Sequence, residues 1–152
     1  MDRRQFVLAG ASTAALGIAS TVLGAEESAP SKATTTPAAL ANAKSRELVD
    51  AGFDCVKAGE ICMEHCLERL RQGDESMSKC SATVATMLPM CRALAALALQ
   101  GSPHLAEHAG TCAKVCRDCE AACKVHAGHH EACRRCMETC QRCASACERY
   151  AA

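Results

Sequence analysis

Aromatic residues are nearly absent from this sequence, which has no Trp, one Tyr and two Phe among 152 residues. Without stacking rings, the chain has no platform for the bases of single-stranded nucleic acid. Net charge is also absent, because 17 Lys and Arg balance 17 Asp and Glu. This balance excludes a basic nucleic-acid binder and a strongly acidic tail, so nucleic acid is not an expected partner.

Catalytic patterns are missing as well. The sequence has no Ser/His/Asp constellation and no phosphate-binding glycine loop. From residue 43 onward there is almost none of the alternation that is typical of strands. We therefore expect an all-α protein that is not an enzyme.

The first 25 residues have the composition of an export signal, with Arg3 and Arg4 followed by a mildly apolar run to Ala19. The paired arginines favour a twin-arginine signal over an ordinary secretory one, which predicts a periplasmic or exported protein. The run is too short and too polar for stable membrane insertion. Residues 26–42 contain two prolines and three consecutive threonines, which predict a flexible linker.

Turn residues divide 43–152 into four predicted helices. A glycine follows each of the first three segments, and Ser102 with Pro103 is typical of a helix start. Pro89 lies inside the second segment and should kink it or interrupt its hydrogen bonds. Short connections make neighbouring helices antiparallel, so the sequence predicts one antiparallel four-helix bundle. The predicted helices span about 43–72, 74–100, 102–127 and 129–150.

Cysteine is the most informative residue, since 14 of the roughly 127 residues after the signal are Cys, about 11%. Within the predicted helices they recur at intervals of three, four, seven or eleven, which places them on one face of each helix. Leu and Ile normally occupy such core positions. The last helix has no Leu, Ile, Val or Phe, so a cysteine-lined core is predicted. The fourteen are Cys55, Cys62, Cys66, Cys80, Cys91, Cys112, Cys116, Cys119, Cys123, Cys133, Cys136, Cys140, Cys143 and Cys147.

A core of thiols has several interpretations. Free cysteines pack as small hydrophobes, but five thiols on one helix face without larger apolar residues would fill a core poorly. Disulfides need Cβ atoms about 3.8 Å apart, against about 5–6 Å for residues three or four apart on a helix, so bridges would have to cross between helices. Structural zinc, iron–sulfur sites and a thiol–disulfide enzyme are further alternatives, although their cysteines normally lie in loops or after a strand.

Cu(I) is the ion that the pattern favours. Soft thiolates select it, and a nearly linear ion with two bonds of about 2.3 Å spans sulfurs on residues three or four apart. Equal numbers of thiolates and Cu(I) ions leave the core neutral, whereas each Zn²⁺ in a four-cysteine site leaves two negative charges to bury. We therefore predict that the fourteen cysteines bind multiple Cu(I) ions per chain.

The chain resembles the exported bacterial copper storage proteins. It shares with them the segment Cys-Met-Glu-His-Cys at 62–66, the tandem cysteine spacing of the last two helices and the twin-arginine signal. The resemblance implies a store of many Cu(I) ions, a homotetramer, and partner proteins that donate or accept copper. It also implies that His65 and Met77 are ligands at the open end of the bundle, where Arg69 and Gln72 take positions expected to hold methionine.

The two ends of the predicted bundle differ in the residues that continue the cysteine faces. Met77, His126 and His129 lie at the turns of one end, close to His65, and we expect copper to enter there. The other end finishes in apolar side chains, namely Leu48, Leu94, Ala98, Leu105 and Tyr150. We expect the remaining histidines to be solvated loop residues, namely His104, His108 and His130.

Overall fold

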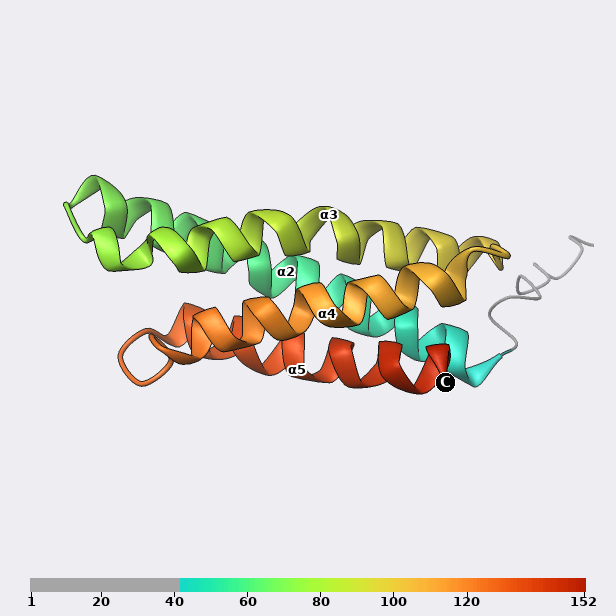
Figure 1. Ribbon diagram of the computed structural model, residues 1–152. Coiled ribbons are helices and arrows are strands. Elements are labelled where there is room, and N and C mark those ends of the chain that lie inside the picture. Colours follow the sequence, from blue (N-terminus) through green and yellow to red (C-terminus); the bar gives the residue numbers. More distant parts are fainter. Residues whose placement is uncertain (1–41) are drawn as a thin grey trace, which may run out of the picture. The chain divides into compact units, whose positions relative to one another are not determined.

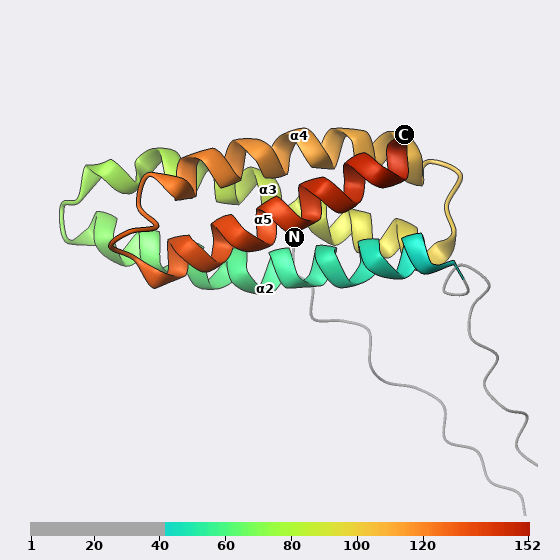
Figure 2. The same cartoon turned by 90° about the horizontal axis from the view of Figure 1, so that it is seen from below.

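The computed structural model describes residues 42–152, which form an antiparallel four-helix bundle (Figures 1 and 2). Helix α2 packs against α3 and α5, and α4 packs against the same two helices. The predicted all-α bundle is confirmed, whereas the predicted export signal and nearly all of the predicted linker lie outside the described residues. The helical elements are α2 (Ala43–Arg71), the short 3₁₀ helix η1 (Glu75–Met77), α3 (Ser78–Gln100), α4 (Leu105–Lys124) and α5 (Glu131–Ala151).

Helix α2 begins and ends where its local sequence favours a boundary. The side chain of Asn42 accepts a hydrogen bond from the backbone N–H of Lys44 at 2.9 Å, which is the usual role of an N-cap residue. Arg69 and Arg71 lie in the last turn, where positive charge complements the helix dipole. Gly73 follows with φ +85°, a left-handed conformation that favours glycine. The predicted end of this helix at Gly73 is confirmed.

Helix α3 runs unbroken through Pro89 and ends at Gly101, which has φ +61°. Proline offers no amide hydrogen to the carbonyl of Ala85, so the interruption is confined to one hydrogen bond. Within the part of the chain that the structure describes, only the stretch Glu75–Gln100 is long and apolar enough to cross a membrane by length and composition. Core helices pass the same test, and this one carries buried cysteines that face the other helices.

Three of the four predicted limits of the last two helices are wrong by two or three residues. Helix α4 begins at Leu105 because Ser102 forms a turn, its hydroxyl accepting from the backbone N–H of His104 at 3.2 Å. The same helix ends at Lys124 rather than at residue 127, and α5 begins at Glu131 rather than at residue 129. Between them, the carbonyl of His126 accepts from the N–H groups of residues 129 and 130 at 3.1 and 3.0 Å. Those turns replace the expected helical ends.

Two glycines of α2 allow it to approach α3 closely. A Cβ atom on Gly59 would lie 2.6 Å from the Cε atom of Met87, and one on Gly52 would lie 3.0 Å from the carbonyl oxygen of Cys91. Real Cβ atoms almost never have neighbours closer than 3.0 Å. The close pairing of α2 and α3 therefore depends on glycine at position 52, where the neighbour is backbone, whereas at position 59 the end of the flexible Met87 side chain would have to move.

Candidate metal centre

The interior of the bundle is lined with sulfur along its length. All fourteen cysteines are free thiols with no exposed surface. Each belongs to at least one of five groups in which every sulfur lies within 4.8 Å of the others. The groups are Cys55/Cys91/Cys116/Cys143, Cys62/Cys66/Cys80/Cys133, Cys62/Cys123/Cys136, Cys112/Cys143/Cys147 and Cys119/Cys136/Cys140. The predicted cysteine-lined core is confirmed.

Neighbouring groups share sulfurs rather than standing apart. Cys62, Cys136 and Cys143 each belong to two of the five groups. Cys62 and Cys136 link three groups into one set, and Cys143 links the other two, so metal ions bound within a set would share ligands. Such a chain of overlapping sites suits an ion that needs few sulfurs, because isolated four-sulfur sites require ligands of their own.

Most of the close sulfur contacts join different helices, which the sequence did not predict. Six of the seven thiol–thiol hydrogen bonds among the described residues are of this kind. The shortest joins Cys80 of α3 to Cys123 of α4 at 3.5 Å. The exception within one helix joins Cys119 to Cys123 at 4.0 Å. Sequence spacing identified sulfurs on one helix as the pairing units, and the structure adds pairs between helices.

The thiol network has no buried counter-charge. Among residues 42–152, the polar or charged side chains that are buried are those of Ser45 and Thr139, and neither carries a charge. The hydroxyl of Thr139 donates to backbone carbonyls within its own helix, α5. Thiolates formed in this interior must therefore be neutralised by the metal itself, since uncompensated buried charge is strongly unfavourable.

Hydrogen bonding makes the thiols unequal in acidity. Hydrogen bonds from Cys123 and three other thiols hold the pKa of Cys80 well below its ordinary range, because each donor stabilises the thiolate. By contrast, hydrogen bonds to Cys112 and Cys116, together with burial, raise the pKa of Cys91. Cys80 thus loses its proton more readily than Cys91, which lies eleven residues further along α3.

One end of the bundle, which we call the mouth, carries His65, Met77, His126 and His130 beside the α2–α3 and α4–α5 turns. The ring centroids of His65 and His130 lie 4.7 Å apart, and those of His126 and His130 lie 6.3 Å apart. The Nε2 atom of His65 is buried and has no hydrogen-bond partner in the described part of the chain. A buried nitrogen without a partner is costly unless a ligand satisfies it.

Two expectations about the mouth are corrected by the structure. His130 lies in the turn before α5 as expected, but it is partly buried and its ring contacts that of His65 at a tilt of 49° rather than being solvated. Burial, followed by the charge of His65, lowers the pKa of His130. His129, expected to face the cysteine core, is exposed. Sequence spacing missed His130 because it lies in the turn before α5, where helical periodicity does not apply. Met77 is at the mouth as predicted, but it is fully buried.

The other two histidines lie away from the mouth. His104 is exposed in the turn before α4, as predicted. His108 lies within α4, and its Nε2 atom is 2.9 Å from the carbonyl oxygen of Met90, so it is not a loop residue. At the end opposite the mouth, the described core ends in the predicted apolar residues, namely Leu48, Leu94, Ala98, Leu105 and Tyr150. Of these, Tyr150 is only partly buried.

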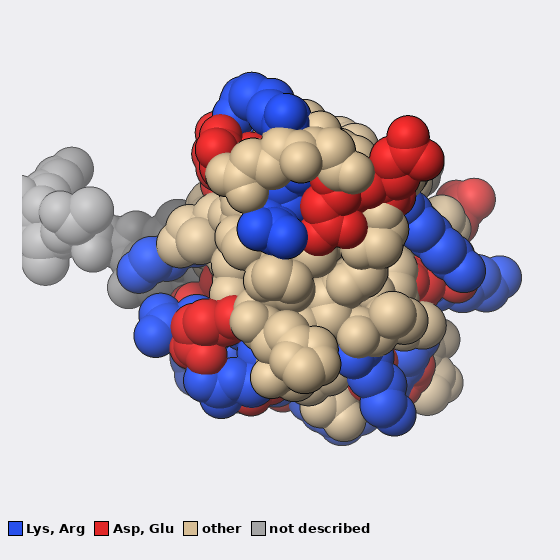
Figure 3. Space-filling model, turned by 90° about the vertical axis from the view of Figure 1, so that its left-hand side faces the viewer, with Lys and Arg blue, Asp and Glu red and all other residues tan. Residues whose placement is uncertain are grey.

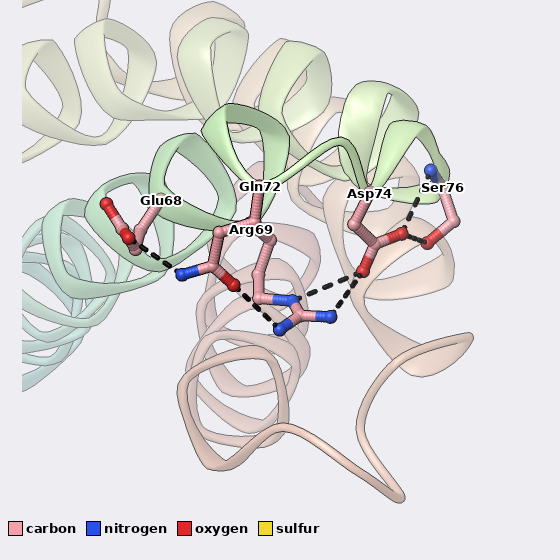
Figure 4. Close-up of polar contacts among 5 residues, drawn as sticks. All are labelled: Glu68, Arg69, Gln72, Asp74 and Ser76. Carbon is pink, nitrogen blue, oxygen red and sulfur yellow. Dashed lines mark hydrogen bonds and ion pairs between the residues drawn. The ribbon is translucent and has the colours of Figure 1, made fainter.

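A polar network spans the rim of the mouth at the α2–α3 turn (Figure 4). The guanidinium of Arg69 donates twice to Asp74, at 3.1 and 3.2 Å, and once to Gln72 at 3.0 Å. Asp74 also accepts from the hydroxyl and the backbone N–H of Ser76. The amide of Gln72 donates to Glu68 at 2.7 Å. Arg69 and Gln72, which replace expected methionines, therefore hold the turn rather than offer sulfur ligands.

The surface at this end has no large patch of charged residues of a single sign. Figure 3 views the mouth end of the bundle, where uncharged surface lies among scattered groups of both signs. This distribution agrees with the equal numbers of acidic and basic residues in the chain. An approaching cation thus meets neither a strong attractive field nor a strong repulsive one.

Comparison with known proteins places these features in a family. A family model described as copper storage protein matches residues 41–152. The uncharacterized cysteine-rich protein YhjQ of Bacillus subtilis (strain 168) is 34% identical over 95 residues, which cover 62% of this chain and 83% of that protein.

Solved structures give the same result. Apo copper storage protein 3 from Bacillus subtilis is 29% identical, with a TM-score of 0.63, over 71% of this chain and 99% of that one. Cu(I)-bound copper storage protein BsCsp3 is 29% identical, with a TM-score of 0.66, over 72% and 99%. The copper storage protein Ccsp from Streptomyces lividans, loaded with 10 copper equivalents, is 28% identical, with a TM-score of 0.65, over 71% and 83%. The sulfur-lined bundle, the family match and these likenesses together show that the chain belongs to the copper storage protein family.

Proposed function

We propose that this protein stores Cu(I), binding multiple ions through its fourteen core thiolates. The observation that carries the proposal is the overlap of the sulfur groups within two sets, one linked through Cys62 and Cys136 and the other through Cys143. Soft thiolates select Cu(I), and an ion that needs only two or three sulfurs can share them with its neighbours. The solved relatives support this function, since one is described as Cu(I)-bound and another as loaded with copper.

Zinc is the competing cargo, because two of the sulfur groups contain four cysteines each. Four thiolates around Zn²⁺ carry two negative charges, and no buried Lys or Arg among residues 42–152 compensates them. An equal number of Cu(I) ions and thiolates is neutral. Burial therefore favours copper over zinc in this interior.

Anaerobic titration of the reduced full chain with Cu(I) and, separately, with Zn²⁺ tests the proposal. We expect Cu(I) to saturate near one ion per cysteine, on the order of fourteen. Replacing Cys116 and Cys140 by Ala should lower that capacity by about two ions and leave the initial loading rate unchanged, since both sulfurs lie away from the mouth. Saturation at three or four ions, with equal uptake of zinc, would indicate discrete zinc-type sites instead.

We further propose that copper passes through the mouth, with His65 and Met77 as exchangeable ligands and His130 as a third. The unpaired Nε2 atom of His65 and its contact with the ring of His130 support this role. Burial keeps the pKa of His130 low, so its imidazole is neutral and can donate a lone pair to a metal. Neutral ligands bind less tightly than thiolates, which allows an ion to move inward by ligand exchange.

The proposal extends to the cell and to partners. Arg3 and Arg4 support export by the twin-arginine route, and hence a periplasmic or exported store. We propose that this store acts without catalysis. Phe53 and Ile61 are 53% and 51% exposed on α2, which supports association of copies, and we propose the homotetramer. Proteins that donate or accept copper are the expected partners at the mouth. Sedimentation of the purified chain tests the tetramer, and fractionation of cells tests the export.

A further inference from the structure

We propose that the mouth also captures Cu(II) and reduces it to Cu(I), with the thiols of Cys80 and Cys123 as the electron donors. This inference rests on the proposed storage function, since the reduced ions enter the remaining thiols. Two features of the structure support it, namely a group of imidazoles at the mouth and a close pair of thiols from different helices.

The imidazoles provide ligands of the kind that Cu(II) prefers. Nitrogen ligands suit Cu(II), whereas thiolates select Cu(I). His65, His126 and His130 lie together at the mouth, with ring centroids 4.7 Å apart for the first and third and 6.3 Å apart for the second and third. The buried Nε2 atom of His65 has no partner among the described residues. An ion that arrives as Cu(II) therefore meets nitrogen before sulfur.

The thiol pair lies one helical turn along the chain from two residues of the mouth. Cys80 follows Met77 by three residues, and Cys123 precedes His126 by three, with the N–H of His126 donating to the carbonyl of Cys123 at 3.0 Å. The two sulfur atoms are 3.5 Å apart, the shortest thiol–thiol hydrogen bond in the described chain. A disulfide needs about 2.05 Å, so a small movement of the two side chains joins them.

The reaction balances with two cupric ions and no other reactant. Two Cu²⁺ ions accept one electron each and become Cu⁺. The two S–H bonds of Cys80 and Cys123 break, one S–S bond forms between their sulfurs, and two protons leave to solvent. The Cu⁺ ions then bind among the other twelve thiols. Because each pair of thiols reacts once, the process is stoichiometric and implies no turnover.

A second thiol pair offers a matched control. Cys91 and Cys116 also join α3 to α4, and their sulfurs are 3.6 Å apart. They lie deeper, eleven residues beyond Cys80 on α3 and seven before Cys123 on α4. If proximity of sulfurs alone decided the reaction, both pairs would react. If the imidazoles deliver the ion, the pair at the mouth reacts first.

The experiment adds two equivalents of Cu(II) to the reduced, metal-free full chain under argon. Loss of the Cu(II) electron paramagnetic resonance signal gives the rate of reduction. A Cu(I) chelator then removes the metal, thiols are counted, and mass spectrometry of proteolytic fragments locates any disulfide. The variants are C80S/C123S, the control C91S/C116S, and H65A/H130A, in which every thiol is retained. Circular dichroism checks that each variant is helical.

We expect the signal to disappear in the unmodified chain, the thiol count to fall from fourteen to twelve, and the disulfide to join Cys80 to Cys123. C91S/C116S binds fewer Cu(I) ions but should still reduce Cu(II) and form the Cys80–Cys123 disulfide. C80S/C123S and H65A/H130A should be slower by about tenfold or more, since one lacks the donors and the other cannot position the ion. If the C80S/C123S variant does not fold, the disulfide map and H65A/H130A still decide the outcome.

Three results would overturn the inference: a persistent Cu(II) signal, equal rates for the two sulfur variants, or disulfides spread over other pairs. Anaerobic loading of the same unmodified sample with Cu(I) separates this failure from failure of the storage function. If Cu(I) is bound in high ratio while Cu(II) is not reduced at the mouth, storage stands and the reductive step is wrong. If neither ion is bound, the storage function itself is wrong.

Discussion

Replacement of Leu94 by Ala should strongly destabilise the metal-free bundle. Thiols and alanines fill most of the core, and the large side chains that are fully buried include only a few leucines, among them Leu94 near the end opposite the mouth. Removal of a buried leucine side chain typically costs about 2–5 kcal/mol through lost burial and the cavity left behind. We expect about 3 kcal/mol for Leu94, which in a domain of this size lowers Tm by roughly 10–20 °C.

Two variants on the same helix calibrate this value. Cys91→Ala, one turn away and equally buried, removes only a small side chain and should cost about 1 kcal/mol. Leu99→Ala removes a leucine that is 37% exposed, so its effect should be below about 1 kcal/mol. The assay is urea unfolding of reduced, metal-free protein, followed by circular dichroism. If Leu94→Ala costs no more than Cys91→Ala, thiol packing rather than the apolar end holds the metal-free bundle, and our reasoning is wrong.

The other predictions concern folding without metal, helix packing and copper transfer. Removal of all metal by a Cu(I) chelator under reducing conditions should leave the far-ultraviolet helical signal nearly intact, and loss of that signal would show that the fold requires metal. Gly52→Ala should lower the stability of the bundle in urea unfolding, because the new Cβ atom would lie 3.0 Å from the carbonyl oxygen of Cys91. Gly110→Ala should instead raise the stability by about 0.5–1 kcal/mol, because the nearest atom to its Cβ would be 3.9 Å away. In stopped-flow transfer from a chromophoric Cu(I) chelate, the His65→Ala and Met77→Leu variants should take up Cu(I) more slowly, with almost the same number of ions bound at the end. Leucine is chosen because it keeps the volume of the buried Met77. Equal rates for these variants and an exposed-histidine control, His104→Ala, would mean that copper enters elsewhere.

The sequence determined the local structure and the inward direction of the cysteines. Helix length, the glycines at positions 73 and 101, and the three- and four-residue intervals of the thiols are local properties, which hydrogen bonding and helical geometry convert directly into elements and faces. The all-α bundle, its sulfur-lined core and the two different ends could thus be predicted. The limits of α4 and α5 could not, because the carbonyl of His126 binds two later N–H groups in a turn that has no regular period.

Tertiary structure alone decided which groups meet. Whether Cys80 approaches Cys123, and Cys91 approaches Cys116, depends on the rotation and the separation of α3 and α4, which the pattern within one helix does not fix. The contact of His130 with His65 likewise joins a turn to a distant helix. Sequence periodicity gives the face of each helix, but the register between faces follows from packing the whole core at once. That register brings separate thiols together into groups that share metal ligands.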